Sequence, residues 1–401
     1  MVSLADIQSA DIRISQNIIH TPLVHSPTIS EITGANVYLK LETLQKAGSF
    51  KVRGASNKIL SHLTEIGDKG VIAASAGNHA QGVAVAAHSA GIPATIVMPV
   101  WSSLRKQEAT RGYGAQVILH GQNLEESIGK AQEIARKGQL FIHPYDDDEV
   151  IAGQGTIALE ILSVLPKTDI IVVPIGGGGL IAGIATAAKA KKPDITIIGA
   201  QTKVCPSAIE ALHHATPYRI LAGDTIADGI RVAETGVQTL PLIQHYVDQL
   251  VLSSEEEIAD AMLLLLERKH IVAEGAGAVP LAALLNGSFD IPSSSNIVLV
   301  ISGGNVDSTL LFRVMRQSLA RQGRIMRFSI MLADQPGTLA RLLAVIANER
   351  GNILHIHHTQ GESDIPVMMT RVSIELETRG WDHIEGFKKA LSDNGYEIRM
   401  G

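Results

Sequence analysis

With 401 residues, the chain is longer than a single hydrophobic core usually supports, so we expect more than one domain. A formal net charge of −6, without a block of basic residues, argues against nucleic-acid binding and suits an enzyme that acts on small molecules. The single cysteine, Cys205, excludes an internal disulfide and a metal site of several thiolates, and it indicates a reducing compartment, which we take to be the cytoplasm.

Most of the chain alternates predicted strands with predicted helices. Residues 1–17 are typical of an amphipathic helix and not of a signal peptide, because acidic residues interrupt their apolar positions. Short connections between strands and helices predict parallel sheets of the α/β class, with a turn between two lobes at Pro144–Asp148. The strands are expected at residues 37–42, 70–74, 94–99, 116–119, 169–173, 195–199, 249–252 and 297–301.

The segment Ile170–Ala188 carries no charged residue and resembles a membrane span in that respect alone. Pro174 and four consecutive glycines lie in its middle, where they would break a helix. We therefore expect a strand, a glycine loop and a helix in this segment.

The C-terminal part follows a different plan. From Arg327 onward, the expected order is strand, helix, strand, strand, helix, strand, which is the ferredoxin-like βαββαβ arrangement. We place a catalytic domain at residues 1–321, with a small lobe at about 47–145 inserted in a larger lobe. A linker at 322–326 then leads to a regulatory domain at 327–401.

The lysine of the stretch Gly48–Ala55 is in an unusual place. We expect Ser49 to be the N-cap of a helix at Phe50–His62, which puts Lys51 in the first turn. The helix dipole and burial both lower a lysine pKa at that position and favour the nucleophilic free amine. The alternative is an ordinary surface lysine.

Gly176, Gly177, Gly178 and Gly179 follow a buried strand and precede a helix. Free backbone N–H groups at such a helix start bind anions, so we interpret the loop as a phosphate site. No Gly-Lys-Ser/Thr follows, as a nucleotide P-loop requires, and no acid ends the next strand at Gly199–Gln201, as a dinucleotide site requires. A tight turn for helix–sheet packing is the alternative.

Two further loops with hydroxyl groups stand at predicted strand ends. Ser75-Ala76-Gly77-Asn78 can present donors to a carboxylate, and Ser302-Gly303-Gly304-Asn305 ends the last strand of the predicted α/β part. Ordinary helix capping is the alternative for the first loop. His79 is interpreted as a neutral, hydrogen-bonded histidine and not as a catalytic one.

In combination, these motifs resemble the fold-type II pyridoxal-phosphate family, and within it the threonine dehydratases, over about residues 5 to 320. The tail resembles an ACT regulatory domain through the loop Asp334-x-Pro336-Gly337-x-Leu339. The resemblance implies a two-lobed open parallel-sheet fold like that of tryptophan synthase β. The matching segments, in order, are Gly48–Ala55, Ser75–Gly82, Ala152–Thr156, Pro174–Gly179, Ala227–Gly229, Glu274–Ala278 and Ser302–Asn305.

The resemblance also implies roles for individual residues. Lys51 would hold pyridoxal 5'-phosphate as a Schiff base and then remove the α-proton of the substrate. Phe50 would lie beside the cofactor ring, Asn78 would bond its hydroxyl, and Ser302 its nitrogen. The phosphate would bind Gly176–Gly179, and the substrate carboxylate would bind Ser75, Ala76, Gly77 and Asn78.

The reaction implied is the conversion of L-threonine to 2-oxobutanoate and ammonia, with L-serine to pyruvate as a side activity. A serine-preferring dehydratase or a serine racemase is the alternative. Racemases of this fold carry a second serine at the position of Ala76, and acids that hold a divalent metal at the positions of Gln201 and Ser207, so we expect neither racemisation nor that metal. An amino-acid-sensing protein with an inactive enzyme lobe is the alternative of another class.

The ACT-like tail implies a small effector, expected to be an amino acid. Asp334, Gly337 and Thr338 are the candidate contacts, with Asn352 as a further one. A tail that serves only dimerisation is the alternative. The resemblance implies a homodimer or homotetramer.

Overall fold

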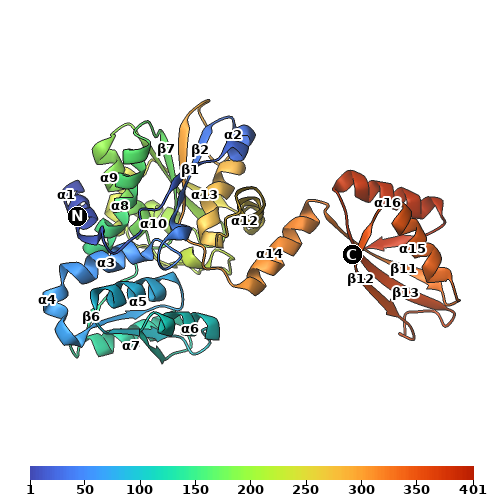
Figure 1. Ribbon diagram of the computed structural model, residues 1–401, viewed down its shortest axis with the longest axis horizontal. Coiled ribbons are helices and arrows are strands. Elements are labelled where there is room, and N and C mark those ends of the chain that lie inside the picture. Colours follow the sequence, from blue (N-terminus) through green and yellow to red (C-terminus); the bar gives the residue numbers. More distant parts are fainter. The chain divides into compact units, whose positions relative to one another are not determined.

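The computed structural model describes residues 1–401 and divides into two compact units, Met1–Asp307 and Ser308–Gly401 (Figure 1). Helix α14 (Ser308–Arg321), which we expected in the catalytic domain, groups with the second unit. None of the helices combines the length and the apolar character that crossing a membrane requires. The segment around Gly176–Gly179 is a strand, a loop and a helix, as expected from its glycines.

The larger lobe of the first unit is built on a six-stranded sheet in the order β1-β2-β10-β7-β8-β9. All neighbours are parallel except β1, which pairs antiparallel with β2. We did not predict β1, because three residues are too few to show an alternating pattern. The strands are β1 (Leu23–His25), β2 (Asn36–Leu41), β7 (Ile170–Pro174), β8 (Thr196–Thr202), β9 (Gln249–Ser253) and β10 (Asn296–Ile301).

Helices surround this sheet on both faces, in the layered α/β arrangement that parallel strands require (Figure 1). They are α1 (Leu4–Ile14), α2 (Pro27–Thr33), α8 (Asp148–Val164), α9 (Gly179–Lys191), α10 (Ser207–His214), α11 (Thr239–Tyr246), α12 (Glu255–Lys269) and α13 (Gly275–Leu285), with short 3₁₀ turns η1 (Glu42–Leu44) and η3 (Asp228–Ile230).

The small lobe has a four-stranded parallel sheet in the order β5-β4-β3-β6. Its strands are β3 (Val71–Ala74), β4 (Ala94–Met98), β5 (Gln116–Leu119) and β6 (Leu140–Phe141). Its helices are α3 (Lys51–Ser61), α4 (Leu63–Ile66), α5 (Asn78–Ala90), α6 (Leu104–Gly112) and α7 (Leu124–Ala135), with the 3₁₀ turn η2 (Gly67–Lys69). The predicted α/β fold with two parallel sheets is therefore confirmed.

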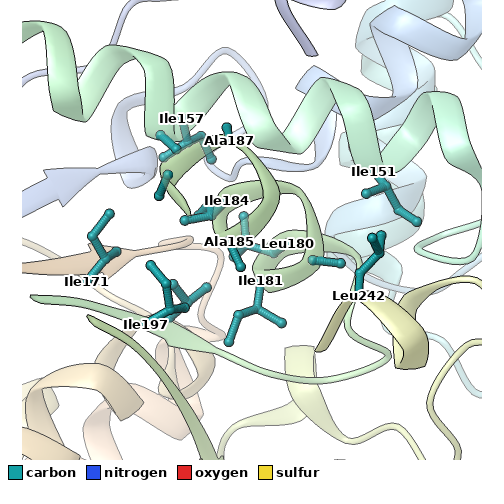
Figure 2. Packing of buried hydrophobic residues seen from close by; sticks show 14 of the residues in the cluster. Ile151, Ile157, Ile171, Leu180, Ile181, Ile184, Ala185, Ala187, Ile197 and Leu242 are labelled. Atoms are coloured by element: carbon teal, nitrogen blue, oxygen red, sulfur yellow. The ribbon is translucent and has the colours of Figure 1, made fainter. Parts of the chain in front are cut away.

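Helix α9 is the centre of the largest hydrophobic cluster. Ile181 and Ile184 pack among Ile157 of α8, Ile171 of β7 and Ile197 of β8 (Figure 2). Each buried side chain of this kind contributes ~1.5–3 kcal/mol relative to an exposed one. Burial on every side explains why this helix has no charged residue before Lys189.

Two glycines set the spacing between α8 and α9. A Cβ atom on Gly155 would lie 2.8 Å from the carbonyl oxygen of Gly183, which is backbone and cannot move aside. The helices therefore pack backbone to backbone at this point. This close approach fixes the start of α9, where the glycine loop lies.

A buried charge cluster joins α3 to the larger lobe. Arg53, which has no exposed surface, donates to Glu42 at 2.8 Å and to Glu160 at 2.6 Å. Lys40 pairs with the same Glu160 and donates to the carbonyl oxygen of Thr21 at 2.6 Å. The two cations and the two carboxylates balance, so the net charge of the cluster is zero. Since Arg53 follows Lys51 by two residues, the cluster also fixes the start of α3.

The second unit is a single four-stranded antiparallel sheet with two helices on one face. Its strands are β11 (Ile325–Ala333), β12 (Asn352–Thr359), β13 (Met369–Glu377) and β14 (Ile398–Met400), and its other helices are α15 (Thr338–Asn348) and α16 (Trp381–Asp393). The strand order β12-β13-β11-β14 is the ferredoxin-like arrangement that we predicted. Leu342, Ile374 and Phe387 are central to its core.

Replacing Arg53 tests the buried charge cluster. Arg53→Leu leaves Glu42 and Glu160 without their main partner, so we expect a loss of ~3–5 kcal/mol in the free energy of unfolding. Arg219→Leu is the matched control, because Arg219 pairs with Glu125 at the surface, and we expect a loss below ~1 kcal/mol. Urea denaturation measures both, and equal losses would contradict the assigned role of the cluster.

Candidate active site

Lys51 is the first residue of α3, but Ser49 does not cap this helix as we expected. The N-cap position falls on Phe50, and no side chain caps the helix. The prediction of Ser49 as N-cap is wrong, because its backbone forms a bridge with Gly303. The Ser49 hydroxyl is buried without a hydrogen-bond partner. This segment is thus tied to the loop after β10 and not to its own helix.

The amine of Lys51 is held by main chain and lies over an aromatic ring. Its Nζ donates to the carbonyl oxygen of Pro144 at 2.7 Å and lies 5.1 Å from the centroid of the Phe50 ring. Removal from water lowers the pKa of Lys51 to about 8, while the carboxyl of Glu274 acts in the opposite direction. A free amine is therefore accessible near neutral pH, as the sequence predicted from the apolar setting of this lysine. The expected contribution of the helix dipole stays a prediction.

A chain of three polar side chains connects the loops around Lys51. Asn78 donates to Glu274 Oε1 at 2.6 Å, and Asn305 donates to Asn78 Oδ1 at 2.9 Å and to the carbonyl oxygen of Ala47 at 2.8 Å. The loops after β3 and β10, the start of α13 and the segment before α3 thus meet at one site.

Glu274 is the residue of this site to which we assigned no role. Burial, followed by the nearby charge of Asp228, raises its pKa to about 8, although the hydrogen bond from Asn78 opposes the shift. The signal in the sequence was an acid directly before Gly275-Ala276-Gly277, and it stands at the N-cap of α13 without capping it. A carboxyl that retains its proton near pH 7 can serve as donor or acceptor in the site.

The four glycines form a cradle between β7 and α9. Gly178 is the N-cap of α9 at φ 98°, in the left-handed region that favours glycine. A Cβ at Gly178 would lie 2.7 Å from Thr239 Oγ1, and the ring of Tyr145 lies against Gly177. No side chain caps the start of α9, and the first N–H groups of a helix have no partner within it, so this donor set fits a phosphate group.

The loop before α5 also ends at an uncapped helix start. Ser75 Oγ accepts from the Gly77 amide at 3.1 Å, and no side chain caps α5 at Gly77. A Cβ on Gly77 would have no atom within 4 Å, so this part of the loop faces open space. Uncapped N–H groups beside open space fit a carboxylate.

Ser302 is buried directly after β10, and its carbonyl oxygen accepts from the Phe50 amide at 3.1 Å. The structure thus brings Phe50, Lys51, Asn78 and Ser302 into one site. His79 contacts the carbonyl oxygen of Ile142 at 2.9 Å through Nε2, and burial lowers its pKa to about 3. It is the neutral, hydrogen-bonded histidine that we predicted.

The side chain of Gln201 joins the glycine loop to α10. Its Nε2 donates to the carbonyl oxygen of Ile175 at 3.2 Å and to Ser207 Oγ at 3.4 Å, and its Oε1 accepts from the Ala208 amide at 3.1 Å. Gln201 is completely buried. No group of three or more His, Cys, Asp or Glu side chains is arranged to hold a metal ion.

The second unit brings only some of the expected effector residues together. Asp334, Gly337 and Thr338 lie near the end of β11 that pairs with Met369, whereas Asn352 pairs with Glu377 at the other end of β13. A separation of eight residues along a strand corresponds to ~26 Å, so Asn352 does not reach the others within one chain. Gln360 donates to Asp334 Oδ1 at 2.9 Å instead.

The site combines a buried lysine of lowered pKa, a glycine cradle for phosphate and uncapped helix starts on an open α/β fold. This combination is typical of enzymes that hold a phosphorylated aldehyde cofactor on a lysine. The family profile described as pyridoxal-phosphate dependent enzyme matches residues 14–303, and the chain belongs to this family. Lys51, the glycine loop, Asn78 and Ser302 all lie within the matched residues.

Relatives with described functions agree with this assignment. The chain is 46% identical to an L-threonine ammonia-lyase of Thermotoga maritima over 403 aligned positions, which cover 100% of both chains. Among solved structures, threonine deaminase isoform 2 of Solanum lycopersicum has a TM-score of 0.75 at 38% identity, over 78% of this chain and 86% of its own. Maize serine racemase also has a TM-score of 0.75, at 37% identity over 80% of this chain and 99% of its own.

The pKa of Lys51 predicts how fast the apo-protein takes up pyridoxal phosphate. Only the free amine reacts with an aldehyde, so we expect the rate to be half-maximal near pH 8 and to level off by about pH 9, whereas a lysine with the ordinary pKa of 10.5 would still gain rate above that pH. Stopped-flow absorbance measures this rate.

In Glu274→Gln the carboxyl group, whose ionised form opposes the shift of the Lys51 pKa, is absent, so the rate of cofactor uptake by this variant should level off at a lower pH than that of the unaltered protein. Lys51→Ala is the control and should show no such reaction. A rate that still rises between pH 9 and pH 10 in the unaltered protein would contradict the lowered pKa.

Proposed function

We propose that this protein is a pyridoxal-phosphate-dependent dehydratase that converts L-threonine to 2-oxobutanoate and ammonia, and L-serine to pyruvate as a side activity. The observation that carries the proposal is the amine of Lys51, which lies over Phe50 and has its pKa lowered to about 8. The charge of Glu274 acts on this amine, and Glu274 in turn accepts a hydrogen bond from Asn78. The similarity to an L-threonine ammonia-lyase over the whole chain supports threonine as the substrate.

Lys51 first holds the cofactor and is then the base. When bound, pyridoxal phosphate withdraws electrons from the α-carbon of the substrate and so acidifies its proton. The freed amine of Lys51 accepts that proton at Nζ, and the carbonyl oxygen of Pro144 is in place to hold the amine. The β-hydroxyl leaves as water after gaining a proton, and hydrolysis of the released enamine gives the 2-oxo acid and ammonia.

The other residues bind and orient. The N–H groups at Gly176–Gly179 hold the cofactor phosphate, and Ser75–Asn78 hold the substrate carboxylate at the start of α5. Ser302 would be the partner of the ring nitrogen, and a neutral hydroxyl there would leave that nitrogen unprotonated, which would favour elimination. Asn78 bonds the ring hydroxyl and is itself oriented by Glu274 and Asn305.

Racemisation of serine is the second candidate, because maize serine racemase is similar in fold. A racemase needs a proton donor on the face of the substrate opposite the lysine. Ala76 supplies no hydroxyl there, and this difference favours the dehydratase.

Replacing Lys51 tests the proposal. Lys51→Ala should retain the melting temperature of the apo-protein, lose the absorbance of the bound cofactor and lower kcat by ~10³-fold or more, because the base is gone. The unaltered protein should be yellow and should change on treatment with borohydride. A colourless protein that borohydride does not alter would instead support a sensing protein with an inactive enzyme lobe.

Steady-state rates with L-threonine and L-serine, with a chiral assay for D-serine, separate the enzyme candidates. A greater kcat/KM for threonine and no D-serine are expected. Abundant D-serine would contradict the argument from Ala76.

We also propose that residues 327–401 form an ACT-like domain that binds an amino-acid effector near Asp334, Gly337 and Thr338. Support comes from the βαββαβ order of the second unit and from the intact loop before α15. A homodimer or homotetramer would let Asn352 of another subunit reach this site, which it does not reach within one chain. The single cysteine suits a cytoplasmic enzyme.

Calorimetric titration with isoleucine, valine and serine tests the effector site. We expect heat of binding from at least one of them, and its loss in Asp334→Ala, since the carboxylate would hold the amino group. Lys388→Ala on the exposed side of α16 is the control and should bind as the unaltered protein does. Equal binding by Asp334→Ala would exclude the loop as the site.

A further inference from the structure

The segment His143–Asp147, here named the connecting turn, joins β6 of the small lobe to α8 of the larger lobe. The carbonyl oxygen of Pro144 accepts from Lys51 Nζ at 2.7 Å. The ring of Tyr145 lies against Gly177, and a Cβ on Gly179 would lie 2.8 Å from the carbonyl oxygen of Tyr145. One short segment therefore contacts both the reactive amine and the glycine cradle.

The connecting turn is also tied to the segment before α11. The carboxylate of Asp146 accepts from the Gln238 amide at 2.7 Å and from the Val237 amide at 3.1 Å. The hydroxyl of Tyr145 donates to the carbonyl oxygen of Glu234 at 3.3 Å. These contacts mean that a shift of the turn would move several walls of the site together.

His143 is the side chain that closes this turn upon itself. Its Nδ1 accepts from the Asp146 amide at 2.7 Å and from the Tyr145 amide at 3.3 Å. An atom that accepts from two N–H groups carries no proton, so the ring proton is on Nε2. The rings of His143 and Tyr145 also meet edge to face, with centroids 4.8 Å apart. Nδ1 is thus the acceptor that closes the turn from within.

We propose that His143 is a positioning residue of the reaction: its neutral Nδ1 fixes the connecting turn so that Pro144 holds the Lys51 amine and Tyr145 backs the glycine cradle. The inference rests on the proposed function, because it assigns the cradle to the cofactor phosphate. It adds a residue that acts on the site through Pro144 and Tyr145 of the connecting turn.

Loss of the acceptor would have two effects at once. The Tyr145 and Asp146 amides would lose their partner, and an unsatisfied buried donor makes the closed turn unfavourable. Pro144 would then release the Lys51 amine, which slows proton transfer. Tyr145 would leave Gly177, which weakens phosphate binding. A residue with a purely structural role would lower stability without changing either quantity in the folded protein.

Three substitutions at one position separate these possibilities. In His143→Asn, the side-chain oxygen can take the place of Nδ1. In His143→Gln, side-chain polarity is kept, but the acceptor stands one bond further out. In His143→Leu, no acceptor remains. If His143→Leu does not fold, the comparison of Asn with Gln still carries the test.

Two quantities are measured for each full-length variant. The first is the dissociation constant of the apo-protein for pyridoxal phosphate, determined by fluorescence, and the second is kcat with L-threonine. We expect His143→Leu and His143→Gln to weaken cofactor binding about tenfold and to lower kcat about tenfold, as loss of a positioning contact typically does. His143→Asn should restore both to within about threefold of the unaltered protein. The melting temperature of each apo-protein identifies variants that have merely lost stability.

Two results would overturn the inference. One is a folded His143→Gln or His143→Leu with unaltered cofactor affinity and kcat. The other is a folded His143→Asn that is as impaired as His143→Gln. An unaltered protein that binds no pyridoxal phosphate would instead overturn the proposed function, so the two failures are distinguishable.

Discussion

The catalytic unit depends on a group of charges that is almost completely removed from water. Arg53 and Lys40 share Glu160, and Arg53 also binds Glu42, so α3, α8 and β2 are joined by ionic hydrogen bonds. Two fully buried cations are costly to remove from solvent and remain in place only with well-oriented partners. The orientation of the helix start follows from this demand. Lys51, two residues before Arg53, therefore has a fixed position before any ligand binds.

Above this cluster, the site is formed where strands end and helices begin. The glycine cradle, the loop before α5 and the loop after β10 follow three different strands. Neither α9, which follows the glycine cradle, nor α5 is capped by a side chain. Uncapped helix starts attract anions, and a cofactor phosphate and an amino-acid carboxylate are both anions. Desolvation lowers the pKa of the Lys51 amine to about 8, so that the free amine is accessible near neutral pH, while Glu274 opposes this effect.

The features found from the sequence were those that local patterns determine. The glycine run, the lysine at a helix start and the strand-end loops each lie within a few neighbouring residues, and the alternation of strands and helices gave the parallel sheets. Contacts between distant segments were not accessible in this way. Glu274 contacts Asn78 across 196 positions, and Pro144 contacts Lys51 across 93 positions, so no local pattern reveals either pair.

The failures of prediction have the same origin. Ser49 has the composition of an N-cap, but its backbone pairs with Gly303, a residue of a distant loop. Asn352 is close to the ACT-like loop in sequence, but the strand register places it at the far end of β13. Strand β6 has two residues and α13 contains Pro280, so neither shows the usual pattern of its type. Tertiary pairing decided the cases of Ser49 and Asn352.

The glycine contact between α8 and α9 sets the distance between two walls of the proposed cofactor site. The connecting turn leads into α8 and the glycine cradle leads into α9, so the separation of the two helices sets the width between these two walls. Gly155 and Gly183 lie inside helices and carry no chemistry of their own. A single methyl group at either position would force the helices apart and widen the site. The shape of the site therefore restricts which residues fit at Gly155 and Gly183, although neither position carries a functional group.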